Sequence, residues 1–550
     1  MSGAEGPADL ALLGGRVFTA VPLGPPANAV AIRSGRLVAV GQEHDVRSLI
    51  GPRTQVVDLA GRMLVPGFQD AHIHAPSAGL GMGRCVLSDV AGVDDYLSLI
   101  RAYAEGHPDN AWVVGEGWML DAFPRGLPHR SSLDAVVRDR PAYFENRDGH
   151  GAWVNSRALE MAGITRDSAD PPDGRIERDA QGDPIGVLQE GAMNLVARLM
   201  PPVSLEEWKE AILRAQTYLH SLGVTAWQDA HVEREHLDAY RSLAEEGRLT
   251  ARVVGALWWN RDQGAEQIQD LIELRTLGSV GRLRCGSVKI MQDGIVENFT
   301  AALTAPYLDG PNASTERDGL SFVEPHALKE VVTRLDREGF QVHFHAIGDR
   351  AVRDCLNAAE AAAAQNGSSD NRHHIAHLQL VHPDDVPRFG SLGVAANIQP
   401  FWACLDGQME HLNLPVLGPE RATWQYPFAR LLRSGAVLAM GSDWQVSTPN
   451  PLLEMEVAVH RAPVDQRGAE PFLPEERLSL QEALSAFTAG SAYVNHLEQT
   501  TGTLEVGKLA DLAVIDRDLF AADAGPIGEG RVVLTVVEGE PVFADPSLGW

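Results

Sequence analysis

The sequence predicts an α/β protein built around a closed barrel of eight parallel strands, and two observations support this fold class. Short apolar runs that are typical of strands alternate with helical patterns through the middle of the chain, as parallel βα units require. The number of these units suits a barrel of eight. At 550 residues the chain is also long enough for about two to four domains, so we expect other domains beside the barrel.

Both ends of the chain predict small β-sheets. Residues 9–62 contain short strand-like runs, which Gly14-Gly15 and Ser34-Gly35 interrupt as turns. Residues 511–515 and 532–537 have the same texture. Because neither end is large enough to close a core alone, we expect both termini to build one composite β-sandwich. We assign residues 1–65 and 498–550 to this sandwich and residues 66–497 to the barrel.

The barrel region contains clear βα units. A helix is expected over 206–222, because Gly223 stops its apolar spacing, and a strand follows over 224–229. Residues from about 76 to 205 dilute the pattern with Gly, Pro and Trp, so we expect an inserted α/β subdomain beside the first unit. The other clear helix–strand pairs are 326–338 with 340–345, and 350–364 with 372–380.

Composition narrows the function classes. The formal net charge of −28 argues against nucleic-acid binding, because phosphate neutralisation needs basic clusters. No apolar run is long enough to span a membrane, and residues 1–10 lack the features of a signal peptide. The four cysteines lie far apart and predict no disulfide framework. We therefore expect a cytoplasmic protein with a small-molecule substrate and no nucleic-acid or membrane partner.

A His-x-His pair follows the first apolar run of the barrel region. Alternate residues of a strand share one face, so His72 and His74 can point the same way. Two neutral imidazoles presented together are a start on a zinc-type site. Two polar residues on an exposed strand remain the alternative, and further ligands elsewhere in the chain decide between the two interpretations.

Lys289 is one of only four lysines among 46 basic residues, and it lies in the apolar run 286–291. Burying an ammonium ion without a partner is costly, so a lysine here suggests chemistry. We interpret it as a lysine that reacts with carbon dioxide to give a carbamate, an anionic oxygen ligand able to bridge two metals. The alternative is a lysine that extends to solvent or pairs with Asp293.

Histidines end two later strand-like runs. His345 follows 341–344 and shares a face with His343, and Gly348-Asp349 behind it predicts the turn into the next helix. His377 ends the run 372–377, where alternation makes His373 its neighbour on the same face. Either residue alone is as well explained as a structural histidine. Together with His72 and His74, they indicate a shared metal site at one end of the barrel.

Asp443 ends the apolar run 436–442 and places a carboxylate where barrel enzymes keep their chemistry. A carboxylate beside a metal can bind it and accept a proton from bound water, whose pKa the metal lowers. The same group can pass that proton to a leaving nitrogen as a general acid. A helix N-cap is the alternative role for this residue.

The ordered set of His72-x-His74, Lys289, two strand-end histidines and Gly441-Ser442-Asp443 resembles the metal-dependent amidohydrolase superfamily. Further stretches are similar to amidohydrolase family 3, the group that contains N-substituted formamide deformylases. These stretches span nearly the whole chain in family order, and they are 65–74, 149–156, 345–350 and 502–512.

The resemblance implies a distorted (β/α)8 TIM barrel with the composite sandwich. It also implies a centre with one or two Zn²⁺ ions, or with Mn²⁺, Fe²⁺ or Ni²⁺ instead, and a homodimer, since solved relatives are often dimers. Many relatives follow the lysine with a loop of small residues, whereas this chain has Gln292 to Thr300 with Glu297 inside it. We expect this loop to lie over the site and to determine the substrate. The implied metal ligands are His72, His74, Lys289, His345, His377 and Asp443.

Several residues are candidates for substrate binding. Glu297 belongs to the changed loop, and the motif around His150 and Trp153 predicts a pocket wall or lid, with packing inside the insertion as the alternative. Arg350 could orient a substrate anion or pair with a neighbouring aspartate. The candidate apolar walls are Trp118, Trp402 and Trp444, although an aromatic residue is more often part of a core.

The expected function is hydrolysis of a non-peptide C–N bond, with an N-substituted formamide or another small amide as substrate. Metal-bound hydroxide would attack the carbonyl and Asp443 would move the proton. A deaminase or cyclic-amide hydrolase with one metal and an unmodified Lys289 is the second interpretation. A catalytically silent binding relative is the third, and the full ligand set argues against it.

Overall fold

An eight-stranded parallel sheet forms the centre of the computed structural model, which describes residues 6–548 apart from 23, 25, 89, 91 and 309–315. Neighbouring strands pair in the order β20-β19-β18-β17-β16-β15-β14-β7. This sheet confirms the predicted barrel. Its strands are β7 (Phe68–Ile73), β14 (Val224–Val232), β15 (Arg252–Trp258), β16 (Leu283–Met291), β17 (Gln341–Ala346), β18 (His374–His377), β19 (Ala395–Ile398) and β20 (Leu438–Met440).

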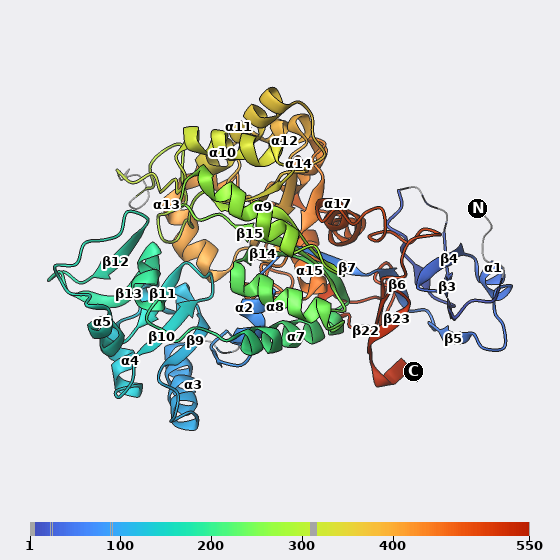
Figure 1. Cartoon of the computed structure of the whole chain (residues 1–550), viewed down its shortest axis with the longest axis horizontal. Coiled ribbons are helices and arrows are strands. Elements are labelled where there is room, and N and C mark those ends of the chain that lie inside the picture. The colour runs from blue at the N-terminus through green and yellow to red at the C-terminus, as the bar shows by residue number, and fades with distance from the viewer. Residues whose placement is uncertain are drawn as a thin grey trace.

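Helices connect the strands and surround the barrel (Figure 1). The helix expected over 206–222 is α7, which Ser204 and Glu207 begin with reciprocal capping hydrogen bonds. Gly223 follows it with a φ of +83°, a conformation that glycine adopts without strain. Within the described residues, no helix combines the length and apolar character needed to cross a membrane. The principal barrel helices are α7 (Leu205–Ser221), α8 (Arg234–Glu245), α9 (Ile268–Leu277), α10 (Pro325–Arg337), α11 (Asp349–Asn366), α12 (Val386–Leu392), α14 (Phe428–Arg433) and α15 (Pro451–His460).

The two end strands of this sheet, β7 and β20, meet at the site. The N–H of Asp443 donates to the carbonyl of His72, and the N–H of His74 donates to the carbonyl of Trp444, both at 2.7 Å. A Cβ on Gly441 would lie 2.5 Å from the backbone nitrogen of His72, so only glycine allows this approach. The closure of the barrel therefore holds the His-x-His pair against the Asp443 segment.

The insertion forms a six-stranded sheet with its own apolar core. Its strands pair in the order β12-β13-β11-β10-β9-β8, and Figure 1 shows β9 to β13 in light blue to teal on one side of the barrel. Helix α3 (Val93–Gly106) packs its buried face into a core that includes Trp118 and Trp153. The strands are β8 (Cys85–Val86), β9 (Val113–Trp118), β10 (Ala142–Asn146), β11 (Gly151–Val154), β12 (Gly174–Arg178) and β13 (Pro184–Glu190).

Both termini contribute to the sandwich, as expected. One sheet has the order β4-β3-β1-β5, and the other, β2-β6-β21-β22-β23, joins strands from both ends of the chain (Figure 1). Strand β6 runs directly into β7 of the barrel. The exact domain boundaries stay predictions. The strands are β1 (Leu10–Leu13), β2 (Arg16–Val17), β3 (Ala29–Arg33), β4 (Arg36–Gly41), β5 (Gln55–Asp58), β6 (Met63–Pro66), β21 (Leu512–Ile515), β22 (Val532–Val537) and β23 (Glu540–Ala544).

Candidate metal centre

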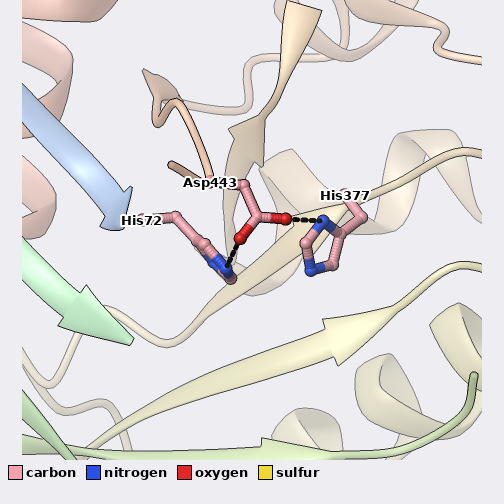
Figure 2. A group of neighbouring side chains, drawn as sticks. All are labelled: His72, His377 and Asp443. Carbon is pink, nitrogen blue, oxygen red and sulfur yellow. Dashed lines mark ion pairs between the residues drawn. The ribbon is translucent and has the colours of Figure 1, made fainter. Parts of the chain in front are cut away.

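Asp443 lies among three histidines at the carboxyl ends of the barrel strands. Its Oδ1 is 3.2 Å from Nε2 of His72 and 3.0 Å from Nε2 of His74. Its Oδ2 is 3.8 Å from Nδ1 of His377, and Figure 2 shows the carboxylate between the rings of His72 and His377. One donor atom each from His72, His377 and Asp443 falls within 4.8 Å of the other two. Strands far apart in sequence thus bring their side chains to one point.

A hydrogen bond inside the barrel sets the orientation of the His72 ring. Nδ1 of His72 lies 2.8 Å from Nε2 of His343, so its Nε2 faces Asp443. The ring centroid of His343 is 4.1 Å from that of His374, whose Nε2 in turn lies 3.0 Å from Oε1 of Gln228 on the opposite side of the barrel. Such a partner behind a ligand fixes both its tautomer and its direction.

The donor atoms fit a divalent cation. Among the described residues, neither ring nitrogen of His377 has a hydrogen-bond partner, and Oδ1 of Asp443 contacts its histidines without hydrogen-bond geometry. Both side chains are nearly inaccessible to solvent. A buried polar atom without a partner costs about 1–3 kcal/mol, so this arrangement is unfavourable unless something binds it. Imidazole nitrogens with a carboxylate are the donor set that zinc prefers.

Burial sets the protonation states that such a site needs. It lowers the pKa of His72 to about 3, and it holds the pKa values of His345 and His377 well below the usual range. Burial opposes charge on Asp443, but the adjacent histidines outweigh it and hold its pKa well below normal. Neutral imidazoles and an ionised carboxylate are the forms that bind a metal.

Lys289 on β16 lies beside these groups. Its Nζ is 3.5 Å from Nε2 of His72, and its side chain is almost completely buried. Burial lowers the pKa of Lys289 to about 7. Within the described part of the chain no carboxylate comes within ion-pair distance of it. Asp293, the partner that the alternative required, instead accepts the N–H groups of Ile347 and Gly348.

His345 at the end of β17 adjoins the compact group. Its ring centroid is 4.4 Å from that of His377, and its Nδ1 is 3.3 Å from Oδ1 of Asp293 without forming a hydrogen bond. The structure therefore brings all six predicted ligands to one end of the barrel. His72, His74 and His377 surround the Asp443 carboxylate, Lys289 lies beside His72, and His345 lies beside His377.

His150 reaches the site from the insertion, where Glu190 fixes it. Nδ1 of His150 is 2.8 Å from the Glu190 carboxylate, which also accepts the Thr300 hydroxyl at 2.6 Å. Burial works against charge on His150, yet Glu190 outweighs it and raises the pKa of His150 to about 9. Glu190 was not predicted from the sequence, because its partners lie 40 and 110 residues away and no local motif marks it.

Two cavities meet at the metal centre. The smaller lies between the loop from Gln292 to Thr300, the insertion and the region from Phe401 to Tyr426. The larger extends along the insertion and is lined by His231 and Lys289 among others. A substrate bound at the centre could thus place one group in each cavity. The residues that line both are Asp148, His150, His345, His377, Asp443 and Val446.

Some of the predicted substrate-binding residues line these cavities and others do not. His150, Glu297 and Trp402 line the smaller cavity. Four other side chains line neither, and those predictions are corrected. Trp118 and Trp153 pack in the insertion core, Arg350 pairs with Asp318 at 2.7 Å, and the Trp444 ring packs against Tyr218.

The barrel and its strand-end donors define a metal-dependent hydrolase, and comparison with known proteins identifies the family. Residues 55–543 match the model of the amidohydrolase family, so the chain belongs to that family. This assignment confirms the resemblance inferred from the sequence motifs.

Individual relatives extend over most of the chain. It is 33% identical to Protein LONG AFTER FAR-RED 3 of Arabidopsis thaliana, covering 98% of this chain and 92% of that protein. It is 26% identical to an N-substituted formamide deformylase of Arthrobacter pascens, covering 96% and 97%. A solved metal-dependent hydrolase from Pyrococcus furiosus superposes with a TM-score of 0.71 at 28% identity, covering 92% and 99%.

Proposed function

We propose that the protein hydrolyses the amide bond of a small non-peptide substrate, with N-substituted formamides as the leading class. The observation that carries this proposal is the convergence of Asp443 and the strand-end histidines where two cavities meet. The relative from Arthrobacter pascens that is named as a formamide deformylase supports the choice of bond. Water and the amide would give a carboxylic acid and an amine.

Each side chain would have a separate task. His72, His74 and Asp443 would hold one divalent ion, and His345 and His377 a second. A metal bound there would polarise the carbonyl and lower the pKa of a water molecule. Asp443 would take a proton from the attacking water at its carboxylate and pass it to the leaving nitrogen. His150, as an imidazolium paired with Glu190, would stabilise negative charge developing on the carbonyl oxygen.

Lys289 would bridge the two metal positions as a carbamate. Burial lowers the pKa of its amine to about 7, so a substantial fraction is neutral near pH 7, and this neutral form attacks the carbon of CO₂ and then loses a proton. The resulting carbamate oxygens would complete an oxygen and nitrogen donor set, for which zinc is the first choice. Mn²⁺, Fe²⁺ or Ni²⁺ could occupy the same donors.

The test is a panel of formamides, other small amides and lactams, assayed with the metal-loaded protein. We expect turnover of formamides by the unaltered protein. Asp443→Asn should lower kcat by about 1000-fold or more while much of the metal is retained, because the amide side chain cannot accept the proton. Asp523→Asn, a surface change, is the control. Normal turnover by the Asp443→Asn variant would contradict the assigned role.

A further inference from the structure

The smaller cavity carries an excess of negative charge beside the metal centre. Asp148, Glu297 and Asp406 all line it. Within the described residues, none of these carboxylates has a Lys, Arg or His nitrogen within ion-pair distance. A partly enclosed group of unpaired carboxylates is unfavourable, because they repel one another and lose contact with water.

The cationic side chains around this cavity are engaged elsewhere. Arg147 also lines it, but its Nε donates to the carbonyl of Val446 at 3.0 Å and its Nη1 contacts Sδ of Met119 at 3.4 Å. His150 is paired with Glu190, whose charge offsets its own. Arg147 therefore offers at most one positive charge to the three carboxyl groups.

Glu297 orients the side-chain amide of Asn413 directly and, through Asn413, that of Gln379. A carboxylate only accepts hydrogen bonds, so Asn413 turns its NH₂ toward Glu297, at 2.7 Å. The carbonyl oxygen of Asn413 then accepts from the NH₂ of Gln379 at 3.0 Å. This orientation leaves the carbonyl oxygen of Gln379 as its remaining polar atom. These two hydrogen bonds therefore leave Gln379, in the cavity wall, with a carbonyl oxygen that can accept a hydrogen bond from a ligand.

Two buried side chains in the wall lack partners for their oxygens. Gln379 and Tyr426 are each only 3% exposed, and both line the cavity. Among the described residues, no hydrogen bond involves the carbonyl oxygen of Gln379 or the hydroxyl of Tyr426. Both oxygens keep some accessible surface at the cavity, so they are free to form hydrogen bonds with a ligand there. They add a carbonyl acceptor and a hydroxyl, which can accept or donate, to the three carboxylates.

Electrostatics and shape agree on the kind of ligand. Burial raises the pKa of Asp148 to about 7 and that of Asp406 to about 6, and Glu297 adds to both shifts. A bound cation would relieve that cost. Phe401 and Trp402 supply aromatic walls, which attract cations through their ring faces.

We propose that the smaller cavity binds an ammonium or guanidinium group of the substrate, so that the enzyme selects amides carrying a terminal organic cation. The reaction in this inference, amide hydrolysis, rests on the proposed function. The ligand in this inference, an organic cation, rests on the cavity alone. Glu297 is the central residue, because it supplies a charge and orients Asn413 and Gln379.

The test is calorimetric binding of three probes of similar length to the metal-loaded protein: n-butylammonium, n-butylguanidinium and the neutral pentan-1-ol. We expect both cations to bind at least about tenfold more tightly than pentan-1-ol. Glu297→Gln should weaken both cations about tenfold and leave pentan-1-ol unchanged. Glu330→Gln, an exposed change on α10, should alter none of the affinities. Asp406→Asn is the second variant if Glu297→Gln does not fold.

Each outcome decides between the alternatives. Equal affinity for all three probes, or cation binding that Glu297→Gln leaves intact, would overturn the cation site. Ammonium binding that persists in Glu297→Gln while guanidinium binding is absent would indicate amine coordination to the metal and also overturn it. Selective cation binding without any amide hydrolysis would instead overturn the proposed reaction and leave the site standing.

Discussion

At the scale of single residues, the contact with Glu190 distinguishes His150 from the histidines that we expect to bind metal. Burial keeps the strand-end histidines neutral, as metal ligands must be, whereas Glu190 holds His150 as a cation. The two kinds of histidine lie close together, since the ring centroids of His150 and His345 are 5.4 Å apart. Their different environments imply different roles.

His150→Gln should lower kcat by about 100-fold, the usual effect of removing one donor that stabilises an oxyanion. Glu190→Gln should have a smaller effect in the same direction, because the imidazole remains but loses the carboxylate that keeps it charged. Steady-state kinetics on the best amide of the panel measures both variants, and His326→Gln, on the surface, is the control.

Metal content must accompany these assays. We expect both variants to bind as much metal as the unaltered protein, because neither residue contacts the donors of His72, His377 and Asp443. Loss of activity in parallel with loss of metal would show that His150 supports the centre rather than the substrate.

Residue-level prediction from the sequence succeeded where strand periodicity holds and failed where it breaks. Alternation pairs His373 with His377, yet His373 bonds Asp336 on α10 while His374 lies inside the barrel. The reason is local: His377 has a φ of +76°, which ends the alternation before the ligand. Trp153 and Arg350 failed differently, because a motif does not reveal whether a side chain faces a core, a partner or a cavity.

At the scale of elements, one aspartate joins two helices to the strand that carries His377. Asp336, near the end of α10, accepts hydrogen bonds from Asn366, Ser369 and Asn371 as well as His373. These donors lie at the end of α11 and in the segment that enters β18. Although burial opposes charge, the donors outweigh it and hold the pKa of Asp336 well below its usual value.

Asp336→Asn should lower the free energy of unfolding at pH 7 by about 2 kcal/mol, because an amide cannot accept from all four donors. Thermal unfolding measures the change, with the exposed Asp384→Asn as control. A lowered native pKa stabilises the fold in full above the unfolded pKa of about 3.9, and this contribution is lost progressively as the pH falls from there towards the lower native pKa. The difference between the two proteins should therefore shrink from pH 5 downward, and a constant difference would contradict this account.

Elements that have strong periodicity and capping were predictable from sequence. The helices expected over 206–222, 326–338 and 350–364 are α7, α10 and α11. The ends of strands were harder to predict from sequence. The run expected over 372–380 forms only β18, because Leu378, like His377, adopts a positive φ. Strand ends at a barrel mouth bend toward the site, and that bending depends on tertiary contacts that periodicity does not record.

At the scale of the whole molecule, distant segments combine to build and support the site. The insertion supplies His150, while the barrel supplies the donors. The sandwich is joined to the barrel by Arg252, which pairs with Asp511 and Glu538, both at 2.8 Å. The strand β6 of that sandwich leads directly into β7 and His72. The sequence could predict these parts, but not that the insertion and the loop with Glu297 would form one cavity.

The central claim is that the strand-end donors bind a catalytic metal, and the metal content of the protein tests it most directly. Protein expressed with zinc and freed of loosely bound ions should contain about one or two equivalents of zinc per chain, measured by elemental mass spectrometry. His377→Ala should lose at least one equivalent, whereas His44→Ala, on the surface, should lose none. A folded protein that binds no metal, or an unchanged content in His377→Ala, would contradict the account.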